Sequence, residues 1–290
     1  MKKLEDRFFK YYWEKLPHEL HYYIGEPGNY KKKYPTEIVT IDNENFIMDQ
    51  LYERDDGILN NVESQSSPTY KKELLRFNDY QRYISTNYKK PVNTIILYTG
   101  NPDHGRYELW ISETNLLKPK YIIFKEMNGN SKLNNLRYKV NNNLSLDDIE
   151  AQDLILIPLM TLDEDIEDTV EELCQLMIKD KSINDNFKFK LRKLEVFIIN
   201  MFVRKEKRKE LFKVIGMDIR LDNLEEDLNN WETEILNKGK LEGKLEGKLE
   251  GKLEGKQEAL EEIAKRLKEK ISIEEISQIT GLSIEKIESL

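Results

Sequence analysis

The residues best suited to chemistry lie within residues 45–68, NFIMDQLYERDDGILNNVESQSSP. A first run rich in strand-forming residues carries Asp49, a turn sequence follows, and a second run carries Glu63 and Gln65. Residues two apart on a strand share one face, so the side chains of Glu63 and Gln65 are expected to point the same way. The pattern predicts a β-hairpin with carboxylates on its polar face.

The length of the turn decides whether Asp49 and Glu63 meet. A two-residue loop would place Asp49 opposite Ser64, with its carboxylate pointing away from Glu63. A three-residue loop that ends at Gly57 would instead place Asp49 directly across from Glu63, on the same face. We expect the three-residue loop, because its last position favours a left-handed residue, the conformation that glycine adopts most readily.

Two carboxylates held directly across a strand pair repel one another. Their Cβ atoms would lie about 5 Å apart. A hard divalent cation with oxygen ligands is the usual way to neutralise such a pair. We therefore interpret Asp49 and Glu63 as ligands of Mg²⁺, with Mn²⁺ as an alternative. The competing interpretation is an ordinary half-exposed hairpin whose polar face meets water, although Asp is disfavoured in the middle of a strand.

The order of these elements resembles the PD-(D/E)XK nuclease superfamily. The resemblance rests on an Asp on one strand, Glu-x-Gln on its neighbour, the sequence SSP, and a helix with Arg76, Phe77 and Tyr80. The chain is most similar to the branch described as transposases or Rpn-type recombination-promoting nucleases, in which the last motif position is Gln. The resemblance covers roughly residues 4–160 and extends to the repetitive tail. It implies an α/β fold with a restriction-endonuclease-like core, in which helices flank a mixed central sheet, and it implies DNA phosphodiester hydrolysis.

Carried over by position, the resemblance assigns roles to single residues. Asp49 and Glu63 would bind the metal, with the Ser64 carbonyl as a third oxygen. Gln65 stands where the superfamily has the Lys that positions and activates the attacking water, and Arg76 and Tyr80 would lie near the site. Two departures leave a weak or lost activity open: Met48 replaces the usual Pro, and Gln65 lacks the positive charge of Lys.

Composition limits the class of protein. The chain has 290 residues, of which 39% are hydrophobic and 34% charged, so it can form a core but must leave part of its length solvated. Its net charge of −8 is the wrong sign for a protein that coats nucleic acid, so any DNA-binding cations must be concentrated locally. A single cysteine, Cys174, excludes an internal disulfide. Without an apolar run of about 20 residues, we expect a cytoplasmic protein with no membrane contact.

Two basic segments are candidates for DNA contact. Lys31, Lys32 and Lys33 stand in a loop predicted over residues 25–35, where they could hold a phosphate backbone or simply face water. A strongly basic helix is predicted over residues 187–214, after an acidic helix that follows Asp163. The two helices could pair by charge within the domain, which we favour, or the basic one could face DNA.

The sequence pattern also predicts the remaining helices and strands. A helix over residues 4–16 ends at Pro17 and offers Asp6 and Glu14 as acids that could join the site or simply face solvent. Further predictions, in chain order, are a strand that begins the sheet near residues 37–41, a helix over 71–88, a buried strand from Val92, a strand pair formed by 107–111 and 121–124, and a third buried run at 153–160.

Three regions are predicted along the chain. Residues 1–220 form the nuclease-like domain, with its core at 4–160 and a helical part at 161–220. Residues 221–256 form a polar linker that contains four copies of KLEG, which we interpret as a soluble spacer.

Residues 257–290 form a small α-helical module, the end of an α-helical C-terminal extension. Its sequence has the helix-turn-helix form, with Gly281 at the turn. The second helix presents Glu285 and Glu288, which match neither base edges nor phosphate. The module is therefore expected to bind a partner or a second copy of the chain rather than DNA.

Two functions remain from the sequence. The first is a Mg²⁺-dependent DNA endonuclease of the transposase-like, recombination-promoting type, with Asp49, Glu63 and Gln65 as its catalytic residues. The second is a catalytically silent nuclease-like adaptor that binds DNA or protein through its C-terminal helices, favoured by Gln65 and by the acidic total charge. A purely structural coiled coil is disfavoured because the first 160 residues are rich in aromatic side chains.

Overall fold

The computed structural model describes residues 2–39, 45–104, 107–217, 229–230, 233, 255, 259–268 and 271–290. The chain divides into two compact units, Met1–Glu232 and Thr233–Leu290. In the part of the chain that is described, no helix combines the length and apolar character needed to cross a membrane.

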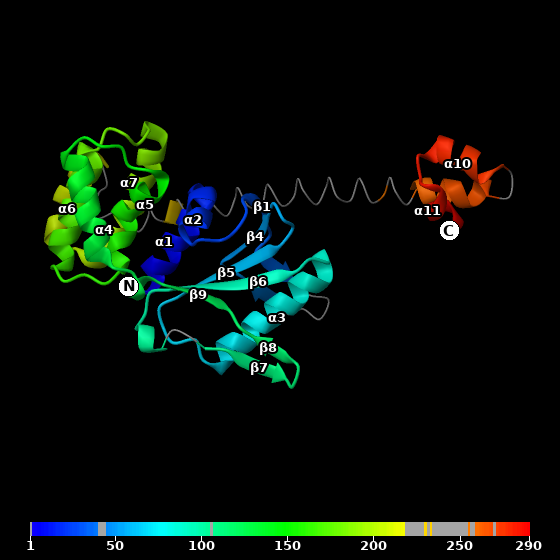
Figure 1. Cartoon of the computed structure of the whole chain (residues 1–290), viewed down its shortest axis with the longest axis horizontal. Helices are drawn as coiled ribbons and strands as arrows, with labels where there is room; N and C mark the ends of the chain where they lie inside the picture. The colour runs from blue at the N-terminus through cyan, green and yellow to red at the C-terminus, as the bar shows by residue number, and fades with distance from the viewer. Residues whose placement is uncertain are drawn as a thin grey trace. The chain divides into compact units, whose positions relative to one another are not determined.

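A mixed five-stranded sheet lies at the centre of the first unit (Figure 1), in the order β1-β4-β5-β6-β9. Its strands are β1 (Tyr30–Tyr34), β4 (Gln50–Arg54), β5 (Leu59–Gln65), β6 (Val92–Tyr98) and β9 (Lys120–Ile123). The pairs β1/β4 and β4/β5 are antiparallel, whereas β5/β6 and β6/β9 are parallel. The expected α/β architecture, a mixed sheet flanked by helices, is confirmed at this level.

Four strands form two small antiparallel sheets, and their pairing differs from the pairing expected from the sequence. The strand predicted near residues 37–41 is β2 (Glu37–Val39), which pairs with β3 (Asn45–Ile47) instead of entering the central sheet. The predicted pairing of 107–111 with 121–124 is wrong. β7 (Leu109–Ser112) pairs with β8 (Asn115–Leu117) across a short local turn, and the apolar β9 runs beside β6 instead.

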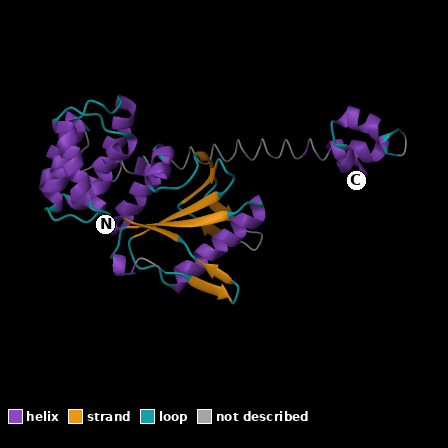
Figure 2. Cartoon of the chain, viewed as in Figure 1, coloured by secondary structure: helices purple, strands orange, loops and turns teal. Residues whose placement is uncertain are grey.

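Helices cover the sheet and gather beside it (Figure 2). In chain order they are α1 (Lys2–Lys15), α2 (Pro17–Tyr23), α3 (Lys71–Tyr88), α4 (Gly129–Asn141), α5 (Asp148–Leu156), α6 (Ile166–Lys179), α7 (Asp185–Phe202) and α8 (Lys205–Val214). Short 3-10 helices occupy Pro102–His104, Phe124–Glu126 and Ile157–Leu159.

The first helix forms as its spacing predicts. The apolar positions that follow the helical period are 0–3% exposed: Phe8, Phe9, Tyr12, Trp13 and Leu16. Trp13 packs on Tyr52 of β4 with 5.3 Å between ring centroids, which attaches α1 to the sheet. Pro17 ends α1 but also begins α2, where its missing N–H costs nothing because the first amides of a helix have no partner.

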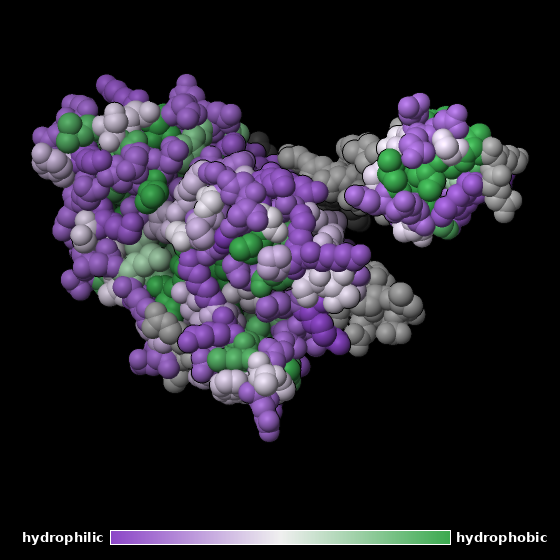
Figure 3. All heavy atoms as spheres, turned by 45° about the vertical axis from the view of Figure 1, so that its right-hand side comes forward, coloured by the Kyte–Doolittle hydropathy of each residue, from purple (hydrophilic) through white to green (hydrophobic). Residues whose placement is uncertain are grey.

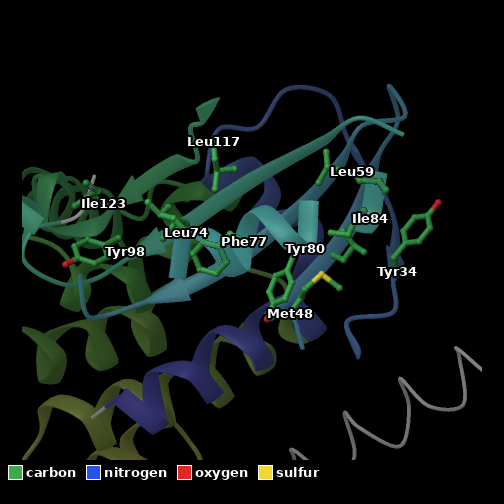
Figure 4. Packing of buried hydrophobic residues seen from close by; sticks show 13 residues of the cluster. Tyr34, Met48, Leu59, Leu74, Phe77, Tyr80, Ile84, Tyr98, Leu117 and Ile123 are labelled. Atoms are coloured by element: carbon green, nitrogen blue, oxygen red, sulfur yellow. The ribbon is translucent and has the colours of Figure 1, made fainter. Parts of the chain in front are cut away.

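The opposite face of the sheet packs against α3, whose bounds match the prediction of 71–88. Figure 4 shows Leu74, Phe77, Tyr80 and Ile84 of this helix in a row against the strands, with Met48 beside Tyr80 and Tyr98 at the far end of the row. These side chains are at most 4% exposed. The helix is therefore fixed where it can support the polar end of the hairpin.

Two helical predictions need correction. The apolar run at 153–160, expected as a further buried run after the strands, lies in α5 and the 3-10 helix that follows it. A short apolar run has the same pattern in a buried helix and in a buried strand. The basic helix predicted over 187–214 is divided into α7 and α8 at Val203, which has an extended conformation. The favoured charge pairing is confirmed for α6 and α8, because Glu167 lies 2.9 Å from Arg204 and 3.2 Å from Lys207.

The second unit contains a helical segment at residues 259–267, α10 (Ile273–Thr280) and α11 (Ile284–Glu288). Gly281 ends α10 in the left-handed conformation with φ of 72°, so the predicted helix-turn-helix form is confirmed. Its core consists of Ala264, Ile276, Leu282 and Ile287. Apart from Gly255, the KLEG repeats lie outside the described residues, as does most of the linker predicted at 221–256.

Candidate metal site

The hairpin that carries the candidate ligands has the predicted three-residue loop. The Arg54 amide donates to the Ile58 carbonyl over 2.9 Å, and the Gly57 amide donates to the Arg54 carbonyl over 3.0 Å. Gly57 has a φ of 85°. The ladder pairs Gln50 with Val62, and one further step along it places Asp49 opposite Glu63.

Asp49 itself does not lie in the middle of a strand, contrary to the expectation. β3 ends at Ile47 and β4 begins at Gln50, so Asp49 stands at the break between them. The Ser64 amide and hydroxyl both donate to the Asp49 Oδ2, over 2.8 and 2.7 Å. Ser64 therefore positions Asp49, a role different from the carbonyl ligand that the resemblance implies for it.

Glu63 is buried and poorly compensated. It is 2% exposed, and its Oε1 has no hydrogen-bond partner among the described residues. The Arg76 guanidinium comes no closer than 3.9 Å to the other carboxylate oxygen, and the Arg76 side chain is 47% exposed. Burial and the neighbouring charge of Asp49 raise the pKa of Glu63 well above its usual range, although Arg76 opposes the rise.

Burial also raises the pKa of Asp49, against the two hydrogen bonds from Ser64. A half-buried and a buried acid side by side, with one oxygen that has no partner among the described residues, form a pair that a cation would stabilise, so Asp49 and Glu63 fit a divalent metal ion. Nowhere in the described ranges do three or more His, Cys, Asp or Glu side chains gather as a metal-binding group. Any further ligands would be amide, hydroxyl or main-chain oxygens, or water.

The acidic side chains of α1 have different partners. Asp6 pairs with Lys10 over 3.1 Å, and its charge contributes to the raised pKa of Asp49. Glu14 instead pairs with Lys33 over 2.8 Å. Glu5, which sequence reasoning missed, accepts a hydrogen bond from the Thr99 hydroxyl at the end of β6. No signal in the sequence distinguishes Glu5, because its position depends on how α1 packs against the strand ends.

Gln65 ends β5 on the same face as Glu63 and is half-buried. It is aligned with Tyr98 of β6, and its carbonyl accepts a hydrogen bond of 3.0 Å from the Thr99 amide. The strand pairing fixes the main chain of Gln65 at the C-terminal end of the central strand β5. The Gln65 side chain is two residues beyond Glu63 on the same face of the strand.

The structure also brings Arg76 and Tyr80 to this end of the hairpin. The Tyr80 hydroxyl donates to the Ile47 carbonyl over 2.9 Å, two residues before Asp49. The Arg76 guanidinium lies over the rings of Phe77 and Tyr80, at 5.1 and 5.8 Å from their centroids. Tyr80 therefore supports the chain near Asp49, whereas Arg76 presents an exposed cation beside Glu63.

The lysine cluster lies elsewhere. Lys31, Lys32 and Lys33 belong to the edge strand β1 rather than to a loop, because pairing with β4 gives the segment a partner that its sequence does not reveal. Lys31 lies 2.8 Å from Glu53, and Lys32 stacks on the Tyr34 ring at 4.5 Å. Lys32 is aligned with Glu53, four residues along the hairpin from Asp49, so the structure does not bring the cluster to the carboxylate pair.

Comparisons with protein-family models, curated proteins and solved structures found no match to this chain. The site is therefore interpreted from its own geometry. That geometry combines a buried acid pair, a hydroxyl that positions one acid, an amide side chain at the strand end and one exposed guanidinium.

Proposed function

We propose that this chain is a metal-dependent DNA endonuclease that hydrolyses phosphodiester bonds, as the resemblance to the PD-(D/E)XK superfamily implies. The observation that supports it most is the alignment of Asp49 with Glu63 across the hairpin, with a buried Glu63 oxygen that has no hydrogen-bond partner among the described residues. A hairpin that served only stability would not place a second acid beside a buried and poorly compensated one.

Asp49 and Glu63 would hold Mg²⁺ or Mn²⁺ in this proposal. Such an ion supplies stabilisation of charge on phosphate and a lowered pKa for water. Ser64 keeps the Asp49 carboxylate in place through its amide and hydroxyl. Gln65 orients the attacking water by hydrogen bonding, and Arg76 draws the phosphate toward the acid pair.

Nicking of supercoiled plasmid tests this proposal directly. Wild-type protein with Mg²⁺ or Mn²⁺ is expected to nick the plasmid, and Asp49→Ala and Glu63→Ala are expected to lose that activity. Asp79→Asn is a matched control, because Asp79 is a half-exposed acid on α3 that pairs with Arg82 over 3.7 Å. A wild type that leaves the plasmid intact with either metal, under conditions where it remains folded, would contradict the proposal.

A second candidate is a catalytically silent adaptor that binds DNA or protein. It is favoured by Gln65, which lacks the charge of Lys, and by the absence of a third acidic or imidazole ligand among the described residues. An adaptor predicts that DNA or partner binding is unchanged in Asp49→Ala. Loss of all binding in that variant would argue against it.

A further inference from the structure

Two tyrosine rings form an exposed pair at the start of α3. Tyr70 is 60% exposed and Tyr107 is 36% exposed, and their ring centroids lie 6.4 Å apart with an angle of 43° between the planes. Single exposed aromatic residues are common on protein surfaces. Two exposed rings in contact, however, present a combined apolar face on which a planar group can stack.

The fold fixes the main chain beneath both rings. Tyr70 is the N-cap residue of α3, with an extended backbone at φ −78° and ψ 175°. The Tyr107 carbonyl accepts a hydrogen bond of 3.0 Å from the Tyr121 hydroxyl, and β7 begins two residues after Tyr107, at Leu109. Ordering these side chains on binding therefore costs little conformational entropy, because the main chain beneath them is already fixed.

The ring pair stands at the same end of the sheet as the acid pair. Tyr98, which is aligned with Gln65, has a pKa raised by burial and further by the nearby phenols of Tyr107 and Tyr70. From the ring pair, α3 leads toward Arg76, about 9 Å further along the helix at its usual rise of about 1.5 Å per residue. Arg76 in turn lies 3.9 Å from Glu63.

Three exposed cations stand on α3 within six residues of Tyr70. Lys71 and Lys72 are exposed in the first turn of α3, and the side chain of Arg76 is 47% exposed. The half-buried Glu73 in the same turn partly offsets their charge. In a chain with a net charge of −8, these three cations are a local concentration of positive charge, which is what phosphate binding requires.

We propose that a strip of surface formed by Tyr70, Tyr107, Lys71, Lys72 and Arg76 binds single-stranded DNA. The two rings of this strip stack on unpaired bases, and its three cations contact the phosphates and lead the strand to Asp49 and Glu63. This inference rests on the proposed endonuclease and specifies its substrate as an unpaired strand. In a duplex the base faces are covered by their neighbours, so an exposed ring can stack only on a base that has left the helix. Any base has such a face, so binding is expected to tolerate most sequences.

Fluorescence anisotropy in EDTA tests the inference without cleavage, with labelled oligothymidylate and a labelled duplex of matching length as probes. Wild-type protein is expected to bind the single strand more tightly. Tyr70→Ala is expected to weaken that binding about tenfold, the usual range for loss of one base–aromatic stack, and Tyr70→Phe is expected to retain it. Tyr138→Ala on α4 is the matched control, because Tyr138 is 62% exposed and lies outside the strip.

Equal affinity for the single strand and the duplex, or the same affinity in Tyr70→Ala as in Tyr138→Ala, would overturn the inference. Failure of the proposed function is a separate result. If plasmid remains uncut while binding still depends on Tyr70, the strip binds single strands and the hydrolysis proposal alone fails. If plasmid is nicked but Tyr70→Ala binds oligothymidylate normally, the strip alone is refuted.

Discussion

Two buried glutamates of the hairpin have opposite environments. The contrast indicates which one stabilises the fold and which one is a candidate for function. Glu53 is buried, but hydrogen bonds from Lys31, Lys90 and Tyr34 overcome the cost of burial and lower its pKa to about 2. Glu63 is equally buried, yet its nearest cation is 3.9 Å away and its pKa is raised. An acid kept without compensation points to a ligand or substrate, so Glu63 is the stronger candidate for function.

The first prediction concerns metal binding by this pair. Mn²⁺ or Mg²⁺ is expected to raise the melting temperature of the wild type, because an ion that binds only the folded state stabilises it by about 2.7 kcal/mol at one hundred times its Kd. Asp49→Asn is expected to lose this response. Thermal unfolding with and without metal measures it, with Asp79→Asn as the control that keeps the wild-type shift. An equal shift in Asp49→Asn would place the metal elsewhere.

Ser64 provides a second test at this scale. Ser64→Ala removes the hydroxyl that donates to Asp49 over 2.7 Å but keeps the amide that donates over 2.8 Å. A hydrogen bond from a hydroxyl to a carboxylate contributes on the order of 1.5 kcal/mol, so Mn²⁺ affinity is expected to fall about tenfold. Calorimetric titration measures the affinity. Ser64→Thr, which keeps a hydroxyl, should remain close to the wild type, and a wild-type affinity in Ser64→Ala would contradict the positioning role.

The meeting of Asp49 and Glu63 could be predicted from the sequence because it depends only on local rules. The side-chain period of two and the loop that ends at Gly57 fix the register between adjacent strands. The contact between Glu5 and Thr99 could not be predicted. It joins residues separated by 94 positions, and nothing in the sequence near either residue indicates the other.

At the scale of elements, the loop of the hairpin depends on the backbone conformation of one glycine. Gly57 has a φ of 85°, and a Cβ at this position would meet nothing within 4 Å, so any cost of substitution is conformational rather than steric. Gly57→Ala is expected to destabilise the fold by about 1–2 kcal/mol. Gly57→Asn should cost less, because Asn tolerates the left-handed region. Urea unfolding measures both; equal losses would mean that the backbone conformation does not decide the cost.

The pair of helices α6 and α7 contains a pH-dependent weakness. Glu195 is fully buried, its Oε1 accepts a hydrogen bond of 3.4 Å from the Cys174 thiol, and its Oε2 has no partner among the described residues. Burial raises the pKa of Glu195 to about 8. Between its ordinary pKa and about 8, the folded chain holds a proton that the unfolded chain releases, so stability falls as pH rises.

Glu195 alone contributes a slope of about 1.4 kcal/mol per pH unit within that window, because it holds one proton in the folded state that the unfolded state releases. Glu195→Gln removes this titrating group and should reduce the slope by that amount. Urea unfolding at about pH 5 and about pH 8 measures it. Glu206→Gln, a change at an exposed acid on α8, is the control that should keep the wild-type slope. An unchanged slope in Glu195→Gln would show that other groups set the pH dependence.

Elements with a clear period were predictable, and elements without one were not. The helix at 71–88 forms at its predicted bounds because its buried positions recur at helical spacing. The buried α5 carries apolar residues on every side, so its pattern does not distinguish a helix from a strand. β1 was predicted as a loop because its lysines suit a solvated turn, and an edge strand often carries lysines too.

At the scale of the whole chain, the order of strands was beyond local rules. β9 lies beside β6 although β7 and β8 come between them in the sequence, so the position of β9 depends on which strand offers a buried edge. The mixed α/β class needs only the types of elements and was predictable. The pairing of distant strands needs the packed core as a whole.

The last prediction concerns the unit Thr233–Leu290. Among the described residues its core has four buried members, with five partly buried apolar side chains packed against them. Ile263, Ile279 and Ile284 are 43–62% exposed, one on each of the described helices of this unit, and Figure 3 shows an apolar patch on its surface. So small a core gains little stability alone, and a second copy of the chain would cover these side chains. Sedimentation of the full chain is expected to show a dimer or larger assembly. Ile279→Lys should shift it toward monomer, whereas Ile178→Lys, at a 40% exposed isoleucine of α6, should not. A wild type that sediments as a monomer at all concentrations would contradict this association.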